Sequence, residues 1–498
     1  MIAMSSKPLG YARTLIIAWA FGTSPGMDAF HLASGIIALF AGSIGSALES
    51  SVLPELVRIR EQTGDHEACG NVAAFISCIL FAATALFVAA LIIAPGLLVR
   101  FFARGFDTER IRMGAIMLWW LIPFAVITIY KPMIDIWANF TERYTLASII
   151  SAPFNFILIP LLLAGIPFIG VYSVAFSLSA GHAILVTFTI AALRGIPMFW
   201  RRGKILWGSL IRIAHNSTFT MAIIASNTLY VIVDRYFAST LPTGSVAAIS
   251  YASILTGVMY SITGTPMMFF LSKMSKLALT EKNETNKMLE NAVSLSMAYL
   301  IPTSVFIMVS SRPVISMIFG WGNFDANSID MTSICLASYS IGFSFSVASS
   351  CFYRYALARQ RLGIIVILSY ISVMMNGLLD WVLVTRWGLL GLTLATSLTQ
   401  ILGFILSYVA FFGWSFHRYI IRMRFFEQTA LSCLFACFAW FAGTYGTAAH
   451  LAAAIILFPL CLAASEKTGL MKNVPEHWHP SHLAAFLASA LKSYIRSK

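Results

Sequence analysis

The chain has 498 residues, of which 59% are hydrophobic and only 11% are charged, and its mean hydropathy is +0.82. A soluble protein of this length needs far more polar surface, so the composition excludes a soluble enzyme or binding domain. The net charge of +13 is better explained by Lys and Arg on the cytoplasmic side of a membrane, facing anionic lipid, than by a nucleic-acid partner.

Apolar runs of about 20 residues follow one another along the chain, separated by charges, Pro and Gly. They are long and lack the strict alternation of barrel strands, so they predict transmembrane helices. The predicted fold class is an all-α polytopic membrane protein with about fourteen spans. The runs lie at residues 9–23, 29–53, 72–99, 113–138, 146–166, 170–193, 217–239, 245–272, 289–311, 328–353, 363–385, 388–412, 427–446 and 448–465.

Basic residues gather in every second loop, which predicts the orientation of the chain. With the N-terminus inside, the cytoplasmic loops hold the basic residues at 58–60, 143, 194–212, 273–287, 354–361 and 418–424. The loop 100–112 is an exception, because it places four arginines outside against Asp107 and Glu109. We therefore expect a multi-pass membrane protein with both termini cytoplasmic.

The basic and aromatic segment 194–216 divides the predicted spans. It predicts an amphipathic cytoplasmic linker on the inner leaflet rather than a span. Six spans precede it, which predicts an N-lobe at 1–193 and a C-lobe at 217–413. Two further spans at 414–465 and a cytoplasmic tail at 466–498 complete the predicted organisation. Transporters commonly contain such paired halves, with the substrate site at their interface.

The stretch Leu9–Leu56 carries Arg13, Asp28 and Glu49 in apolar surroundings. A charge near the bilayer centre costs roughly 2.5–3.5 kcal/mol, so such groups usually face a protein interior or a water-filled cavity. Arg13 suits a pyrophosphate or carboxylate ligand, or an ion pair with Asp28 or Glu49. Asp28 either caps the second span or lines the cavity. Glu49 is either a coupling site or an interfacial, solvated residue.

Polar residues in other spans have a structural and a functional interpretation. Asp234 and Arg235 are adjacent in the seventh span and point about 100° apart, which favours a bridge to another helix over a ligand contact. Asn376 and Asp380 in the eleventh span are candidates for coupling or for a satisfied polar contact. The histidines 31 and 182 lie in apolar runs and are predicted to be packed core residues.

No HExxH motif, no P-loop pattern and no metal-ligand spacing is present. The seven cysteines are scattered and predict apolar packing rather than a metal site or disulfides. The sequence therefore predicts a protein that is not an enzyme and that needs no cofactor. Intramembrane charges also argue against a mere scaffold for a glycan synthase, since a scaffold has no reason to tolerate them.

Several different short motifs follow one another along most of the chain in a specific order. They are Leu9, Gly10, Tyr11, Arg13, Phe21, Gly22 and Asp28–Phe30, then NFTERYTLASIISAPFN (139–155), Asp234–Ser239, Gly244, Ser245, Tyr251, Ala252, IFGWGNFD (318–325), SYSIGF (338–343), Tyr355, Ala356, Asn376 and GLLGLTLATS (388–397). In this order and spacing, from the first span to about the twelfth, the chain resembles the MurJ/MviN lipid II flippase family of the MOP exporter superfamily.

The resemblance implies fourteen helices, two lobes around a cationic cavity, and alternating access. It also implies that the substrate is a polyprenyl-pyrophosphate-linked glycan, carried from the inner to the outer leaflet in contact with membrane lipid. Glycan-synthesis or cell-wall enzymes are the expected protein partners. By the same resemblance Arg13 matches a cavity arginine of the first span, Lys7 stands at another, and Asp28 matches the acidic position of the second span.

Three positions depart from the family pattern. Phe40 and Ala41 stand where the family has an arginine pair in its second span, and Ser253 stands where the family has an arginine in its eighth span. These departures leave open a paralogue that serves an exopolysaccharide or another lipid-linked oligosaccharide. A cation-coupled small-molecule exporter of the same superfamily is a further alternative. The driving force is equally open, with the membrane potential, an ion at Asp28 or Glu49, and the glycan gradient as candidates.

Overall fold

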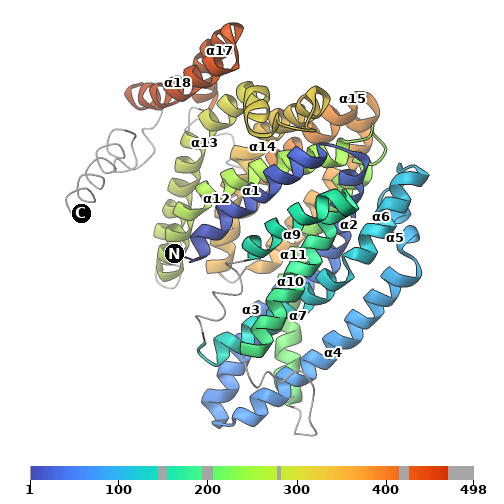
Figure 1. Cartoon of the computed structure of the whole chain (residues 1–498). Helices are drawn as coiled ribbons and strands as arrows, with labels where there is room; N and C mark the ends of the chain where they lie inside the picture. The colour runs from blue at the N-terminus through green and yellow to red at the C-terminus, as the bar shows by residue number, and fades with distance from the viewer. Residues whose placement is uncertain are drawn as a thin grey trace, which may run out of the picture. The chain divides into compact units, whose positions relative to one another are not determined.

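A computed structural model of the chain describes residues 2–143, 154–192, 206–277, 282–359, 361–413, 425–468 and 480. Within these residues the secondary structure consists of helices and the connections between them (Figure 1), which confirms the predicted all-α class. The helices are α1 (Ile2–Phe21), α2 (Pro25–Ile37), the π-helix η1 (Ala38–Gly42), α3 (Ser43–Thr63), α4 (His66–Ile93), α5 (Pro95–Phe102), α6 (Thr108–Trp120), α7 (Ile122–Phe140), α9 (Phe154–Ile169), α10 (Tyr172–Ala192), α11 (Trp207–Ala238), α12 (Ser245–Leu277), α13 (Lys282–Phe319), α14 (Ala326–Ala358), α15 (Leu362–Phe412), α17 (Phe425–Ala442), the 3-10 helix η2 (Gly443–Tyr445) and α18 (Thr447–Lys467).

Each predicted apolar run overlaps one of these helices or a consecutive set of them. Among the described residues, six helices are long and apolar enough to cross a membrane, namely α4, α11, α13, α14, α15 and α18. A seventh span results if α6 and α7, which bend by 47° at their junction, count as one. The count of fourteen spans therefore stays a prediction, while the multi-pass character is clear.

Two of the breaks between helical segments coincide with Pro or Gly. Pro95 stands at the first position of α5, where a missing backbone N–H costs nothing. Gly388 has φ 55° and ψ −129° inside α15, a conformation that suits glycine, and it divides that helix in two. This break coincides with the predicted boundary between the runs 363–385 and 388–412.

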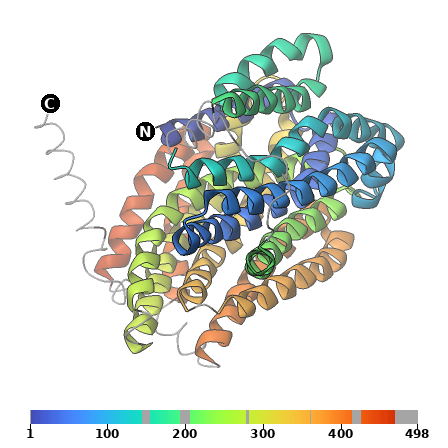
Figure 2. The ribbon, with the colours of Figure 1, turned by 90° about the horizontal axis from the view of Figure 1, so that it is seen from below.

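Two compact units make up the chain. The first comprises Met1–Ala247 with Trp321–Ser328, and the second Ala248–Gly320 with Ile329–Lys498. In the first unit α3 packs against α7 and α11, and α10 packs against α7 and α9 (Figures 1 and 2).

The described part of the predicted linker forms the first turns of α11, and the rest of the linker and most of the predicted tail lie outside the described residues. The division into two six-helix lobes stays a prediction.

The second unit is held by aromatic packing between α14 and α15 and by polar contacts to α17 and α18. The ring of Phe352 stacks on Phe411 with centroids 5.9 Å apart. Gln428 on α17 donates to the carbonyl of Ala298 over 3.1 Å and to the Ser465 hydroxyl over 3.2 Å. Offset and edge-on ring pairs add to the burial of apolar area, and the two hydrogen bonds from the Gln428 amide nitrogen link α17 to α13 and α18.

The segment Trp321–Ser328 closes the end of α1 in the first unit. The backbone N–H of Asn323 donates to the carbonyl of Trp19 over 2.9 Å, and its side-chain amide donates to that of Ala20 over 2.7 Å. These carbonyls belong to the last turn of a helix, which has no partners of its own. A side chain at Gly322 would overlap Trp19, so the close approach explains the glycine in the IFGWGNFD motif.

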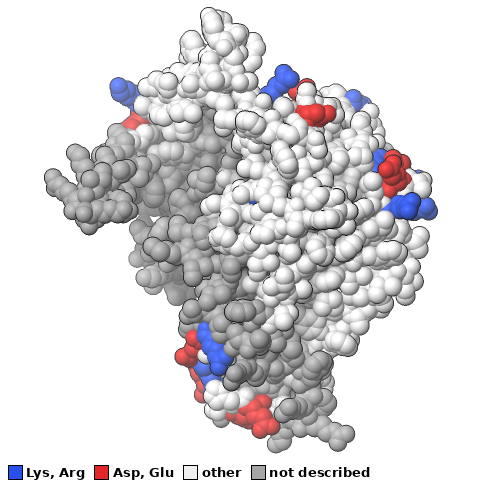
Figure 3. Space-filling view, viewed as in Figure 1, with Lys and Arg blue, Asp and Glu red and all other residues white. Residues whose placement is uncertain are grey.

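Charged side chains of the described residues gather near the upper and lower margins of the face drawn in Figure 3, and a broad uncharged surface lies between them. Exposed apolar residues such as Phe81, Leu86 and Ile93 belong to α4, which passes the test for a span. An apolar surface of this extent fits lipid contact.

The start of α14 supplies a pH prediction. Asp325 accepts hydrogen bonds from the hydroxyl and the backbone N–H of Ser328, which lower the pKa of its carboxyl. Its stabilising contribution is therefore full above the unfolded-state value of about 3.9 and is lost as the pH falls through the lower folded-state pKa. We expect the difference in unfolding free energy between wild type and Asp325→Asn to shrink on acidification below about pH 4. Thermal unfolding in detergent at several pH values measures it, and a pH-independent difference contradicts it.

Candidate functional site

Arg13 lies on α1 and is half-buried. Within the described part of the chain it makes no hydrogen bond and no ion pair. Its positive charge acts on the imidazole of His182 on α10. Of the two predicted ion pairs, the one with Asp28 does not form, because Asp28 pairs with Arg110. The pair with Glu49 stays a prediction, because the Glu49 side chain lies outside the described part of the structure. An arginine without a partner in an apolar span is the expected state of a ligand-binding group.

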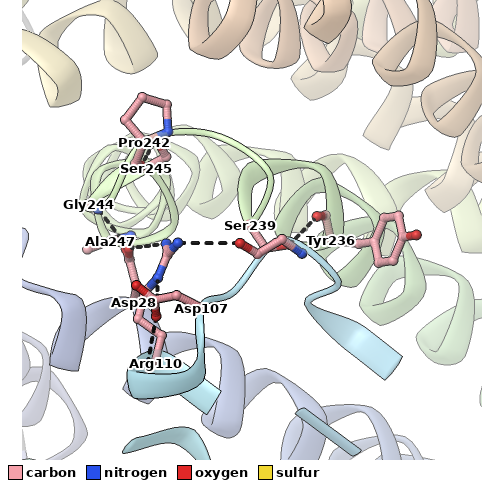
Figure 4. A network of polar contacts seen from close by, with 10 residues as sticks. Asp28, Asp107, Arg110, Tyr236, Ser239, Pro242, Gly244, Ser245 and Ala247 are labelled. Carbon is pink, nitrogen blue, oxygen red and sulfur yellow. Dashed lines mark hydrogen bonds and ion pairs between the residues drawn. The ribbon is translucent and has the colours of Figure 1, made fainter. Parts of the chain in front are cut away.

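Asp28 is completely buried, and both of its carboxylate oxygens are engaged (Figure 4). Oδ2 accepts a hydrogen bond of 2.7 Å from the backbone N–H of Gly244, and Oδ1 accepts one of 2.8 Å from that of Ala247. These donors stand at the start of α12, so Asp28 caps that helix from a distance of more than 200 residues. The expected cap of its own helix was wrong, because the N-cap of α2 is Ser24, without a side-chain hydrogen bond.

Arg110 completes this network and was not predicted. Its side chain is 7% exposed, and Nη1 lies 3.7 Å from Oδ2 of Asp28. Nε lies 3.3 Å from Oδ1 of Asp107, and the guanidinium lies over the ring of Phe106. Asp107 caps α6, and the backbone N–H of Arg110 lowers the pKa of its carboxyl. The spacing of Asp107 and Arg110 at a helix start is typical of an N-cap. It was readable in the sequence, inside the predicted outer loop 100–112.

Arg235 on α11 bridges to α2. Its Nη1 donates to the carbonyl of His31 over 2.6 Å. A Cβ at Gly35 would overlap the guanidinium, so the glycine lets the arginine reach the helix backbone. This geometry favours the structural interpretation of Arg235, and Asp234 beside it is buried.

The other predicted site residues are spread over both units. Asn376 donates to Asp380 over 2.9 Å, and both are completely buried in α15. Ser253 is exposed on α12. Lys7 lies in α1 and Glu49 in α3, but their side chains lie outside the described part of the structure. The assignment of these residues to substrate stays a prediction.

The π-helix η1 occupies the position of the expected arginine pair. Phe40 in η1 packs against Phe87 of α4, with ring centroids 5.0 Å apart. Turns of π-helix often occur at functional sites, yet this one presents an apolar contact. The chain therefore lacks cations at this position, as the sequence predicted.

Lys131 and Asp135 on α7 form an ion pair that sequence reasoning missed. Nζ and Oδ2 lie 2.6 Å apart within the predicted span 113–138. The signal was present, since a Lys and an Asp four residues apart in an apolar run lie on one helix face. Among the described residues, no group of three or more His, Cys, Asp or Glu side chains could hold a metal ion.

Similarity to solved structures defines the class of protein. A structure of the lipid II flippase MurJ in an inward closed conformation matches with a TM-score of 0.77 at 18% identity and covers 94% of this chain and 98% of that chain. An inward-facing MATE family transporter of the MOP superfamily matches with a TM-score of 0.72 at 14% identity, over 82% of this chain and 94% of that chain. The fold is that of the MOP superfamily transporters.

Sequence comparison then gives the family. The family model described as lipid II flippase MurJ matches residues 17–472. A probable lipid II flippase MurJ of Thermotoga maritima is 24% identical over 80% of this chain and 81% of its own. The lipid II flippase MurJ of Burkholderia cenocepacia is 22% identical over 81% of this chain and 80% of its own. The chain belongs to the lipid II flippase MurJ family, which confirms the resemblance found in its motifs.

The capping network predicts unequal costs for its two charged members. Asp28→Ala leaves two backbone N–H groups unpaired and removes the buried carboxylate beside Arg110, which keeps its contact with Asp107. We expect a loss of about 3–5 kcal/mol in unfolding free energy. Arg110→Gln leaves both backbone hydrogen bonds of Asp28 in place and should cost about 1–3 kcal/mol. Unfolding in detergent measures both, together with the double variant. Equal losses, or strictly additive ones, would show that the two residues do not act together.

The contact between α2 and α11 gives a second stability prediction. Gly35→Ala places a methyl group on the Arg235 guanidinium and should lower the unfolding free energy by about 1–3 kcal/mol, as overpacking does. Gly42→Ala is a matched control, because nothing lies within 4 Å of the Cβ position at Gly42. Thermal unfolding of both variants decides the matter, and similar stabilities would refute the contact.

Proposed function

We propose that the protein is a flippase that moves lipid II, an undecaprenyl-pyrophosphate-linked peptidoglycan precursor, from the inner to the outer leaflet by alternating access. The family match over residues 17–472 is the observation that carries this function. The protein is accordingly a transporter and not an enzyme, and it works as a multi-pass protein of the bacterial inner membrane. The inward closed conformation of a structural relative fits a cycle of alternating states.

The physical task explains why a free cation matters. A pyrophosphate headgroup must pass roughly 30 Å of hydrocarbon while its lipid tail stays in the bilayer. A guanidinium holds phosphate oxygens by two parallel hydrogen bonds and stays charged after desolvation. Arg13, half-buried and without a hydrogen bond or ion pair among the described residues, is the group we assign to the pyrophosphate.

Topology, energy source and partners follow as parts of this proposal. The distribution of Lys and Arg supports cytoplasmic termini. Asp28 has both oxygens occupied by backbone donors, so an ion-coupling role for it requires that α12 lose its cap. The membrane potential, the glycan gradient or an ion at Glu49 are simpler sources of energy. Cell-wall or glycan-synthesis enzymes are the proposed protein partners.

The missing arginines support one second candidate, a flippase for another lipid-linked glycan such as an exopolysaccharide precursor. Phe40, Ala41 and Ser253 offer no cation where the family pattern has one. Native mass spectrometry of lipid that copurifies with the protein separates the two, because lipid II carries a peptide. Binding of drugs or sodium without any polyprenyl pyrophosphate would instead favour a MATE-like exporter.

The role of Arg13 is tested by a headgroup-accessibility assay for lipid II in proteoliposomes. Loss of a charge-assisted bidentate contact should reduce flipping by Arg13→Ala about tenfold or more, and Arg13→Lys should retain part of the activity. Arg112→Ala serves as the control, since Arg112 is exposed on α6. Transport at the wild-type rate by Arg13→Ala would remove this residue from the mechanism.

A further inference from the structure

A charged pair inside α7 has no evident structural purpose. Lys131 and Asp135 share one helix, with Nζ and Oδ2 2.6 Å apart and side chains 29% and 12% exposed. A pair at i and i+4 on the same helix joins no two elements and adds little stability. Charges within a span are costly to insert, so this pair calls for a functional explanation.

A comparison within the same unit shows what a structural ion pair looks like here. Arg212 on α11 donates twice to Oε1 of Glu55 on α3, over 2.9 and 2.6 Å, and also to the hydroxyl of Ser209. Those contacts tie two helices together. The Lys131–Asp135 pair has one hydrogen bond, and the second oxygen of Asp135 is buried without a partner among the described residues. The lysine is therefore held by a single contact that another anion can replace.

The pair lies on α7, which packs against α10 in the first unit. Phe124 and Lys131 stand seven residues apart, on one face of α7, and the Phe124 ring packs against His182 of α10 with centroids 4.7 Å apart. The charges of both Arg13 and Lys131 act on His182. The packing of α7 against α10 thus brings Lys131, beside a single carboxylate, to the region of His182, and Arg13 on α1 belongs to the same unit.

Two cations match the chemistry of a diphosphate. Arg13 offers a planar bidentate donor set, while Lys131 offers a flexible ammonium with three donors. We propose that Lys131 is a second binding group for the substrate diphosphate and that Asp135 is its exchangeable counter-ion, which holds the lysine while the site is empty and yields it when the diphosphate binds. The inference rests on the proposed function, because that function supplies the diphosphate. Lys131 then replaces part of the charge that the chain lacks at Phe40, Ala41 and Ser253.

Binding of undecaprenyl diphosphate and undecaprenyl phosphate to the purified full-length protein tests this inference. We expect wild type to prefer the diphosphate, and Lys131→Gln to lower its affinity for the diphosphate about tenfold while affinity for the monophosphate changes little. Lys131→Arg should retain the preference. Asp135→Asn removes the competing carboxylate and should strengthen diphosphate binding a few-fold, a direction opposite to that of a lost structural contact.

The outcomes separate this inference from the proposed function. Lys467→Gln is the matched control, because Lys467 is an exposed lysine at the end of α18. If wild type binds and flips lipid II but Lys131→Gln behaves like wild type, the inference alone fails. If Asp135→Asn weakens diphosphate binding, the pair is structural and the inference is overturned. If wild type binds neither polyprenyl probe, the proposed function fails and the inference falls with it. Should Lys131→Gln not fold, the direction of the Asp135→Asn effect decides.

Discussion

The structure depends on the need to satisfy every buried ionised group, and Asp28 meets this need most fully. Its carboxylate takes two backbone N–H groups at the start of α12 and lies beside the guanidinium of Arg110. A buried carboxylate without such partners costs several kcal/mol, and the first N–H groups of a helix have no partners within it. The hydrogen bonds of Asp28 therefore satisfy both the buried carboxylate and the first N–H groups of α12. They also join the beginning of the chain to its middle.

Against this background, we assign the proposed functional roles to charges on α1 and α7 that lack full partners. Arg235 reaches a backbone carbonyl and Glu55 receives two hydrogen bonds from Arg212, so both belong to the framework. Arg13 and the pair formed by Lys131 and Asp135 are less well satisfied, and they lie on helices of the same unit. The same physical criterion thus separates residues that hold the helices together from residues available to an anion.

Local patterns in the sequence were sufficient for the fold class and for most helix positions. Hydropathy located the apolar runs, and the turn residue at Gly388 marked a real break in α15. The partner of Asp28 could not be inferred, because a cap supplied across 216 residues leaves no local pattern. The Asp-x-x-Arg spacing at Arg110 was readable in the sequence, but the burial of Arg110 beside Asp28 depends on tertiary packing. The ion pair in α7 was visible in the sequence, but its proximity to Arg13 required the arrangement of α1, α7 and α10.

A weaker cationic site is compatible with transport, and the reason lies in the cycle itself. A transporter must bind its substrate on one side and release it on the other, so a ligand moves the equilibrium only as far as its affinities for the two states differ. Several fixed arginines around one diphosphate favour binding in every state. A lysine with its own carboxylate has a return partner 2.6 Å away, so release of the diphosphate leaves no unpaired ammonium in the membrane. In our proposal, the absence of cations at Phe40 and Ala41 and the exchangeable pair on α7 act together, so that the affinity for the diphosphate is lower and its release is easier.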